Sequence, residues 1–135
     1  PAHYLELEVT ETLVMEDDRF QALLQNLRDT GVKLSIDDFG TGFSSLNYLQ
    51  KMPIDRVKVD RQFVQDFTKD KQAHIAETII NLAHKLELST IAEGVEREDQ
   101  AEFLKQIGCE QVQGYLYARP MPLNKLFVYL YNQEN

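Results

Sequence analysis

The sequence has little of what several protein classes require. Only one cysteine, Cys109, occurs among 135 residues, which excludes an internal disulfide framework and favours a reducing, cytoplasmic setting. No apolar run approaches the roughly 20 residues that cross a bilayer, and no charged and apolar signal segment opens the chain. We therefore expect no membrane contact within these residues, although a parent protein could be anchored through other regions.

Basic residues are also scarce. The formal net charge is −8, with 14 Lys and Arg against 22 Asp and Glu, and no stretch concentrates positive charge. This balance argues against DNA or RNA polymers as ligands. A small phosphorylated ligand is still compatible with the acidic chain, because a bound metal ion inverts the local charge.

The apolar pattern alternates between strand and helix five times. Strands are expected at 4–10, 32–36, 56–59, 88–92 and 111–114. Helices are expected over 18–31, around 46–49, over 75–86, over 101–107 and over 122–130. Alternation of this kind predicts an α/β fold in which parallel strands are covered by outer helices.

Polar residues recur at or near the ends of the expected strands: Glu8, Asp37, Asp38, Lys58, Glu93 and Gln113. Two adjacent carboxylates repel each other unless a cation or another partner lies nearby. Carboxylates from different strands can hold two metal ions ~4 Å apart for attack on a phosphodiester, and oxygen ligands favour Mg²⁺ or Mn²⁺. A lysine among them can orient water or neutralise charge on phosphate.

Less specific interpretations exist for several of these residues. Taken alone, Asp37-Asp38 with the following glycines is also typical of a turn that leads into a capped helix. Glu6 is interpreted as structural, and Asp55 and Arg56 as solvated surface. One group of aromatic residues is interpreted as packing residues: Tyr115, Tyr117, Phe127, Tyr129 and Tyr131.

Five segments together resemble one known family. They occupy residues 5–11 (LELEVTE), 37–46 (DDFGTGFSSL), 57–61 (VKVDR), 92–96 (AEGVE) and 113–115 (QGY). In this order they are similar to the C-terminal part of an EAL domain, the bacterial cyclic di-GMP phosphodiesterase. The resemblance implies a TIM-like (β/α) barrel that hydrolyses cyclic di-GMP to linear pGpG with two Mg²⁺ or Mn²⁺ ions.

The resemblance also implies residue roles. Glu8, Asp37 and Asp38 would be metal ligands. Lys58 would hold the attacking water or stabilise charge. Glu93 would act as proton acceptor or water ligand, with Gln113 completing the network around the water.

Further roles follow from the same family pattern. Glu11 would anchor the loop from Asp38 to Ser45, which couples metal binding to dimerisation in this family. Asp60 and Glu96 would support the site from nearby. The substrate loop would consist of Phe39, Gly40, Thr41 and Gly42.

The Glu-Ala-Leu signature and the strand that supplies an Asn ligand are absent, and a complete barrel needs ~250 residues. We therefore expect residues 1–135 to be the C-terminal portion of a single EAL domain, with about five β/α units and the N-terminal part missing. Open sheet edges predict a homodimer or edge-paired oligomer. The alternatives are an inactive cyclic di-GMP receptor or a structural, dimerisation module; the retained polar set favours the enzyme.

Overall fold

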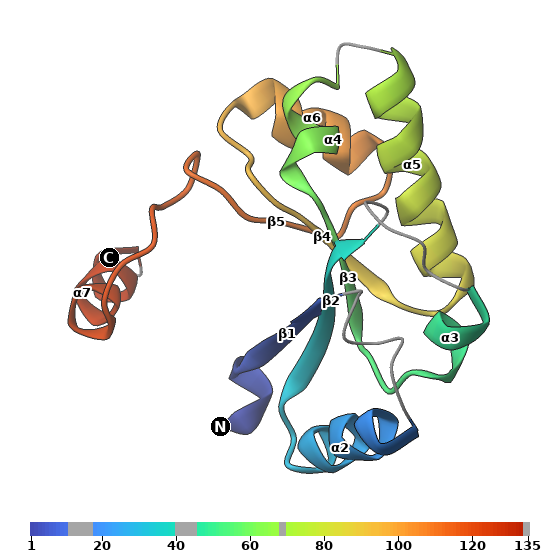
Figure 1. Ribbon diagram of the computed structural model, residues 1–135. Helices are drawn as coiled ribbons and strands as arrows, with labels where there is room; N and C mark the ends of the chain where they lie inside the picture. The colour runs from blue at the N-terminus through green and yellow to red at the C-terminus, as the bar shows by residue number, and fades with distance from the viewer. Residues whose placement is uncertain (11–17, 40–45, 68–69, 134–135) are drawn as a thin grey trace.

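The protein is built on one parallel sheet (Figure 1). The computed structural model describes residues 1–10, 18–39, 46–67 and 70–133. The strands are β1 (Glu6–Thr10), β2 (Lys33–Phe39), β3 (Arg56–Val59), β4 (Ser89–Ala92) and β5 (Gln111–Val112). They lie in the order β1-β2-β3-β4-β5, and every neighbouring pair is parallel. The predicted α/β class is thus confirmed.

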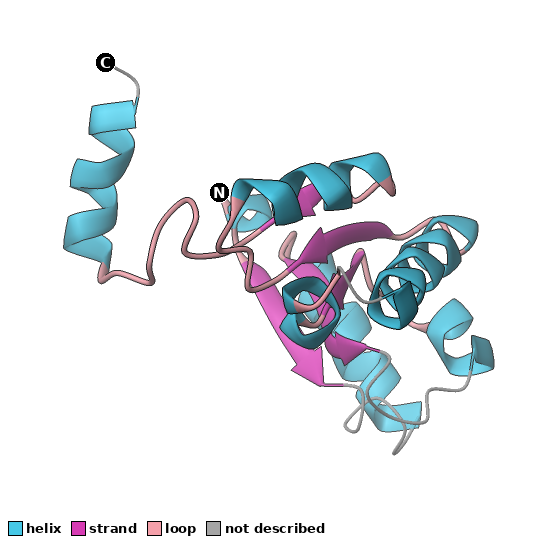
Figure 2. Cartoon of the chain, turned by 90° about the horizontal axis from the view of Figure 1, so that it is seen from above, coloured by secondary structure: helices cyan, strands magenta, loops and turns pink. Residues whose placement is uncertain are grey.

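Helices connect the strands, as Figure 2 shows in a view from above. They are η1 (Ala2–Tyr4), α2 (Asp18–Asp29), α3 (Leu46–Lys51), α4 (Arg61–Gln65), α5 (Asp70–Lys85), α6 (Glu98–Gln106) and α7 (Leu123–Gln133). One helix was expected after β3, but two are present. The first of them, α4, is capped at its N-terminus by Asp60, whose carboxylate accepts a hydrogen bond from the Gln62 backbone N–H at 2.7 Å.

The core lies between the sheet and the helices that cover it. Strand residues such as Ile36 and Val57 and helix residues such as Ile80 and Leu104 are at most 1% exposed. They belong to one hydrophobic cluster. Because side chains alternate along a strand, burying these residues on one face leaves the other face to polar side chains.

The opposite face of the sheet carries charged pairs. Arg56 Nη1 lies 2.6 Å from Glu6 Oε2, with side-chain exposures of 19% and 26%. Asp55, directly before β3, accepts a hydrogen bond from the Leu34 backbone N–H at 3.0 Å, and its side chain is 17% exposed. Glu6, interpreted as structural, is held by this cross-strand ion pair with Arg56. The interpretation of Asp55 and Arg56 as solvated surface was wrong, because both are held by partners across strands.

Helix α7 stands apart from the sheet in Figures 1 and 2. None of its residues is buried, and a hydrogen bond from the Tyr129 hydroxyl to the Tyr117 carbonyl, 3.2 Å long, links it to the body. Phe127 and Tyr131 are 65% and 70% exposed, so neither is a core residue in the described structure. No described helix is long and apolar enough to span a membrane.

Candidate active site

An irregularity in β2 shapes the acidic edge of the sheet. Ile36 pairs with Val57 and Phe39 with Val59, so two residues of β2 stand opposite one residue of β3. This is the pattern of a β-bulge, which redirects side chains next to functional sites. Asp38, inside the bulge, has a φ of 57°, a left-handed conformation that aspartate tolerates better than most residues. The bulge therefore interrupts the alternation that would send adjacent aspartates to opposite faces.

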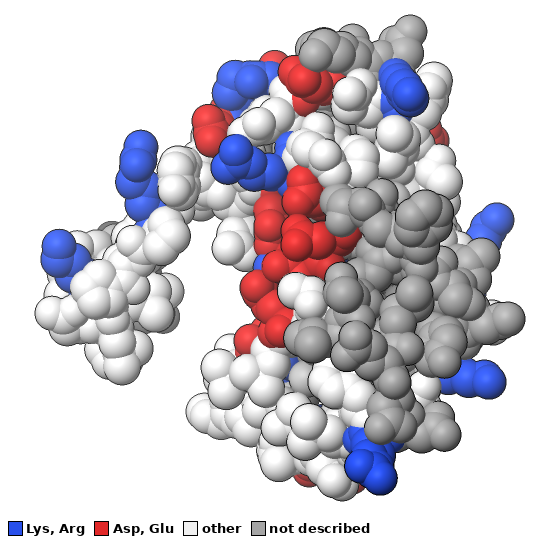
Figure 3. Space-filling view, viewed as in Figure 1, with Lys and Arg blue, Asp and Glu red and all other residues white. Residues whose placement is uncertain are grey.

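Lys58 lies among three carboxylates, from β1, from β2 and from the residue directly after β4. Its Nζ is 2.5 Å from Glu8 Oε1 and 3.6 Å from Asp37 Oδ1, and it also contacts Glu93 Oε1. The lysine side chain is 4% exposed, whereas those of Asp37 and Glu93 are each 24% exposed and that of Glu8 is 50% exposed. Figure 3 shows the acidic side chains gathered at the middle of this face. A nearly buried ammonium thus offsets one of the three negative charges in a partly open acidic cluster.

The acidic surroundings keep Lys58 charged. Burial lowers the pKa of Lys58, but hydrogen bonds to Glu8 and Glu93 outweigh burial and raise the pKa above its ordinary value. Burial raises the pKa of Glu93, against the opposing effect of the Lys58 ammonium. The charge of Asp37 raises the pKa of Asp38, with further contributions from burial and a hydrogen bond with Asp60. Like charge thus dominates the shift of Asp38, carboxylate partners that of Lys58, and burial that of Glu93.

The same carboxylates fit a divalent cation. Glu8, Asp37 and Glu93 each offer an oxygen, and these oxygens all lie within 4.8 Å of one another. Carboxylate oxygens are the ligands that Mg²⁺, Mn²⁺ and Ca²⁺ prefer. The ammonium of Lys58 already lies among these oxygens, which demonstrates that the cluster accommodates positive charge. The family resemblance implied that Glu93 is a proton acceptor or a water ligand, and the structure places one of its oxygens within 4.8 Å of those of Glu8 and Asp37.

The other predicted site residues are distributed around this cluster. Asp38 is exposed, next to Asp37 and within reach of Asp60. Phe39 is only 5% exposed and belongs to the hydrophobic core, so its side chain anchors the end of β2. Four predicted residues lie outside the described part of the chain: Glu11, Gly40, Thr41 and Gly42.

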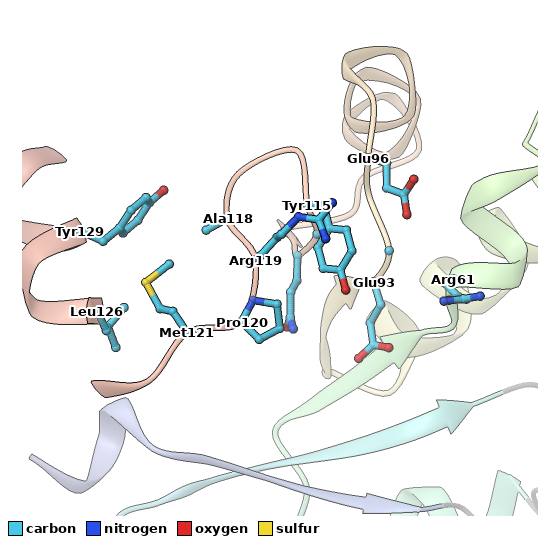
Figure 4. Close-up of a pocket in the computed structure, with 13 residues that line it drawn as sticks. Arg61, Glu93, Glu96, Tyr115, Ala118, Arg119, Pro120, Met121, Leu126 and Tyr129 are labelled. Carbon is cyan, nitrogen blue, oxygen red and sulfur yellow. The ribbon is translucent and has the colours of Figure 1, made fainter. Parts of the chain in front are cut away.

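A pocket of about 450 Å³ adjoins the cluster (Figure 4). Glu93 forms part of its wall together with the predicted residues Gln113 and Glu96. Sequence reasoning missed two further lining residues, Arg61 and Arg119. Arg61 directly follows the predicted site residue Asp60, and both lie in a segment that resembles the family. This position was the sequence signal that could have identified Arg61 as a pocket residue.

Tyr115 also lines this pocket. It is 53% exposed, and the guanidinium carbon of Arg119 lies 4.5 Å from the centroid of its ring. The interpretation of Tyr115 as a packing residue was therefore wrong for the described structure. Together, the cluster and the pocket can hold a cation, neutralise an anion and accommodate an attached organic group, which is what cleavage of a phosphodiester requires.

Comparisons with known proteins agree with these features. The EAL domain model matches residues 1–120. The chain is 51% identical over 131 residues to the cyclic di-GMP phosphodiesterase NbdA of Pseudomonas aeruginosa, a match that covers 96% of this chain and 17% of NbdA. The chain thus spans less than a fifth of the length of that curated relative.

Solved structures share the fold. The PaMucR phosphodiesterase in complex with c-di-GMP is 45% identical, with a TM-score of 0.85, covering 93% of this chain and 51% of that one. Klebsiella pneumoniae BlrP1, solved as calcium and manganese complexes with cy-diGMP, is 36% identical with a TM-score of 0.75. Those matches cover 85% of this chain and 30% of BlrP1. On the family match and these likenesses, the chain belongs to the EAL domain family.

Proposed function

We propose that this chain carries part of the active site of a metal-dependent phosphodiesterase that hydrolyses cyclic di-GMP to linear pGpG. The observation that carries the proposal is the contact of the Lys58 ammonium with Glu8, Asp37 and Glu93 at one edge of the sheet. The family match and the named activity of the 51% identical NbdA support the same reaction. A phosphodiester brings negative charge to the site, and the nearly buried lysine is placed to compensate it.

Two divalent cations, Mg²⁺ or Mn²⁺, are the cofactors that we propose. Glu8, Asp37 and Glu93 would hold one of them, and Asp38, beside Asp37, would contribute to the second. When bound, such cations polarise a phosphoryl oxygen and lower the pKa of water. The manganese complex of BlrP1 supports this choice of metal.

The side chains of this chain would handle the substrate and its protons. Lys58 would orient the attacking water and stabilise the charge that develops on the phosphate. Glu93 would accept a proton from that water, and Gln113, on the wall of the same pocket, would hold the water by a hydrogen bond. Asp60 and Glu96 would support these groups from the ends of the neighbouring elements.

We also propose that residues 1–135 are the C-terminal portion of a single EAL domain. The chain matches 51% of the PaMucR phosphodiesterase chain, which supports a larger domain. Within the described sheet, β1 and β5 each pair with one neighbour. Such edges favour a homodimer or an edge-paired oligomer when this chain is alone. The lone Cys109 supports a cytoplasmic location.

A cyclic di-GMP receptor without turnover is the second candidate. A receptor has no need of a lysine held among three carboxylates, so the intact cluster favours the enzyme over this alternative. A purely structural module would bind neither metal nor nucleotide.

Hydrolysis of cyclic di-GMP by the full-length protein, with Mg²⁺ or Mn²⁺, tests the proposal when compared with its Asp37→Asn variant. We expect linear pGpG from the wild-type protein and none from the variant, because the variant loses a carboxylate at the centre of the site. Asp55→Asn, at the opposite end of β3, is the matched control and should retain turnover in whatever fraction remains folded. Tight binding without turnover by the wild-type protein would identify a receptor instead.

A further inference from the structure

Arg56 repeats, two residues nearer the amino end of β3, the connections that Lys58 makes between strands. Val57, which separates the two residues, is fully buried in the core, so alternation places Arg56 and Lys58 together on the polar face of the sheet. Lys58 contacts Glu8 on β1 and Glu93 directly after β4. Arg56 contacts the same two strands, closer to their amino ends.

The guanidinium of Arg56 uses two different nitrogens for these contacts. Its Nη1 lies 2.6 Å from Glu6 Oε2 on β1, and its Nε donates to Ser89 Oγ on β4 at 3.1 Å. Ser89 Oγ in turn donates to the Asp55 carbonyl at 3.1 Å. A guanidinium is planar and presents its donors in a fixed fork. One side chain therefore holds β1 and β4 in place on either side of β2 and β3.

The contact between Arg56 and Glu6 has to pass over β2, which lies between β1 and β3. Ser35 is the β2 residue that pairs with Arg56 in the sheet. Both residues that flank Ser35 belong to the hydrophobic core, so Ser35 faces the polar side. It is fully buried, and its Oγ has no hydrogen-bond partner among the described residues. The short serine side chain thus leaves room for the two long ones to meet.

The place of Glu8 in the cluster depends on how β1 is held. Glu8 follows Glu6 by two residues on the same face, about 7 Å further along the strand. Within the described sheet, β1 pairs with β2 alone, and Glu8 is the most exposed of the three carboxylates, at 50% against 24%. Metal–ligand distances vary by only about 0.2 Å. A small displacement of β1 is therefore enough to remove Glu8 from a shared cation.

We propose that Arg56 is a positioning residue for the divalent cation. By holding Glu6 and Ser89, it fixes β1 and β4. Those strands then present Glu8 and Glu93 at the distances that one cation needs. This inference rests on the proposed function, because the cation is the proposed Mg²⁺ or Mn²⁺. Arg56 touches neither the cation nor the substrate in this role.

The sign of the effect separates positioning from simple electrostatics. Arg56 is a positive charge close to the cluster, and charge alone repels a cation. Removal of the charge would then strengthen metal binding. Loss of a positioning residue has the opposite effect, because the ligands behind which it stands lose their geometry, and partners of this kind typically contribute roughly 10- to 100-fold in metal affinity.

Titration of the full-length protein with Mn²⁺, followed by electron paramagnetic resonance, tests this role. We expect Arg56→Met to bind Mn²⁺ roughly 10- to 100-fold more weakly than the wild-type protein, and Asp37→Asn identifies which of the bound ions belongs to the cluster. Arg28→Met is the matched control, because Arg28 pairs with Asp55 at 3.1 Å from α2 and its loss should leave Mn²⁺ affinity unchanged. Partial unfolding lowers the number of sites, whereas positioning changes the affinity of those that remain.

Two hydroxyl variants repeat the test without any change of charge, and they carry it if Arg56→Met does not fold. Ser89→Ala removes the contact of Arg56 with β4 and should weaken Mn²⁺ binding, although by less than Arg56→Met. Ser35→Ala removes a hydroxyl that has no partner among the described residues, so its Mn²⁺ affinity should equal that of the wild-type protein. Equal affinities of the two serine variants would contradict the proposal.

An Mn²⁺ affinity of Arg56→Met that equals or exceeds the wild-type value would overturn the positioning role, as would an equal loss in Arg28→Met or the absence of Mn²⁺ binding by the wild-type protein. Hydrolysis of cyclic di-GMP separates this inference from the proposed function. Weaker Mn²⁺ binding by Arg56→Met, with no hydrolysis by the wild-type protein, would refute the enzyme and retain the positioning role. Hydrolysis by the wild-type protein, with Mn²⁺ affinity independent of Arg56, would do the reverse.

Discussion

Removing the ammonium of Lys58 is the sharpest test of how the acidic cluster is stabilised. In a Lys58→Met variant of the full-length protein, side-chain length is nearly kept, while Glu8, Asp37 and Glu93 lose their shared cation. Removing one partner of a buried ion pair costs roughly 3–5 kcal/mol. Two of these carboxylates are 24% exposed and Glu8 is 50% exposed, so water compensates part of the loss. We expect a destabilisation of about 2–3 kcal/mol.

Thermal unfolding in EDTA measures this loss. For a domain of about 150–250 residues, 1 kcal/mol corresponds to a change in Tm of roughly 2–4 °C, so Lys58→Met should lower Tm by about 5–10 °C. Addition of Mn²⁺ should reduce this difference, because a bound cation replaces the missing positive charge among the carboxylates.

Lys33→Met is the matched control, since Lys33 is half exposed and its Nζ lies 3.6 Å from Asp55 Oδ1. An exposed pair of this kind contributes at most about 1 kcal/mol, so Tm should change little. If Lys58→Met is no less stable in EDTA than Lys33→Met, the carboxylates do not depend on the lysine and the reasoning is refuted.

Two further predictions concern other parts of the chain. Burial raises the pKa of Glu110, but hydrogen bonds from Thr90 and from backbone N–H groups outweigh it and lower the pKa. Its stabilising effect is therefore complete above the ordinary glutamate pKa of about 4.3 and is lost as the pH falls through the lowered value; the urea midpoints of the wild-type protein and Glu110→Gln should differ at neutral pH and converge in acid. Residues 1–135 alone should be a dimer, a larger oligomer or poorly stable in light scattering, whereas a stable, monodisperse monomer would contradict edge pairing.

Local sequence patterns predicted most of the sheet. Arg56–Val59 forms β3 with the expected bounds, because its short β-branched run is flanked by Pro53 and a helix cap. The pattern missed the end of β2, where the strand continues through Asp37 and Asp38 to Phe39. Charged residues rarely predict strand, and a bulge depends on the register of the neighbouring strand, which the sequence does not display.

The sequence predicted a site residue well where the role depends on that side chain alone. It predicted the role less well where contacts between separate segments determine the surroundings of the side chain. Lys58 follows from strand alternation, since its neighbours Val57 and Val59 belong to the core face. Arg56 reads as surface in isolation, yet Glu6, which lies two strands away, makes it part of a cross-strand pair. The exposure of Tyr115 depends on a turn against Val95, a contact between segments that no local pattern reports.

The strand order also determines when the acidic cluster acquires its positive charge during folding. Every pair of neighbouring strands is consecutive in the chain, a local topology with a low cost of loop closure. If strands dock in the order of synthesis, Glu8 and Asp37 meet first, Lys58 arrives next and Glu93 arrives last. The lysine thus enters between the second and third carboxylates, so these four groups never carry more than two uncompensated negative charges while the sheet grows.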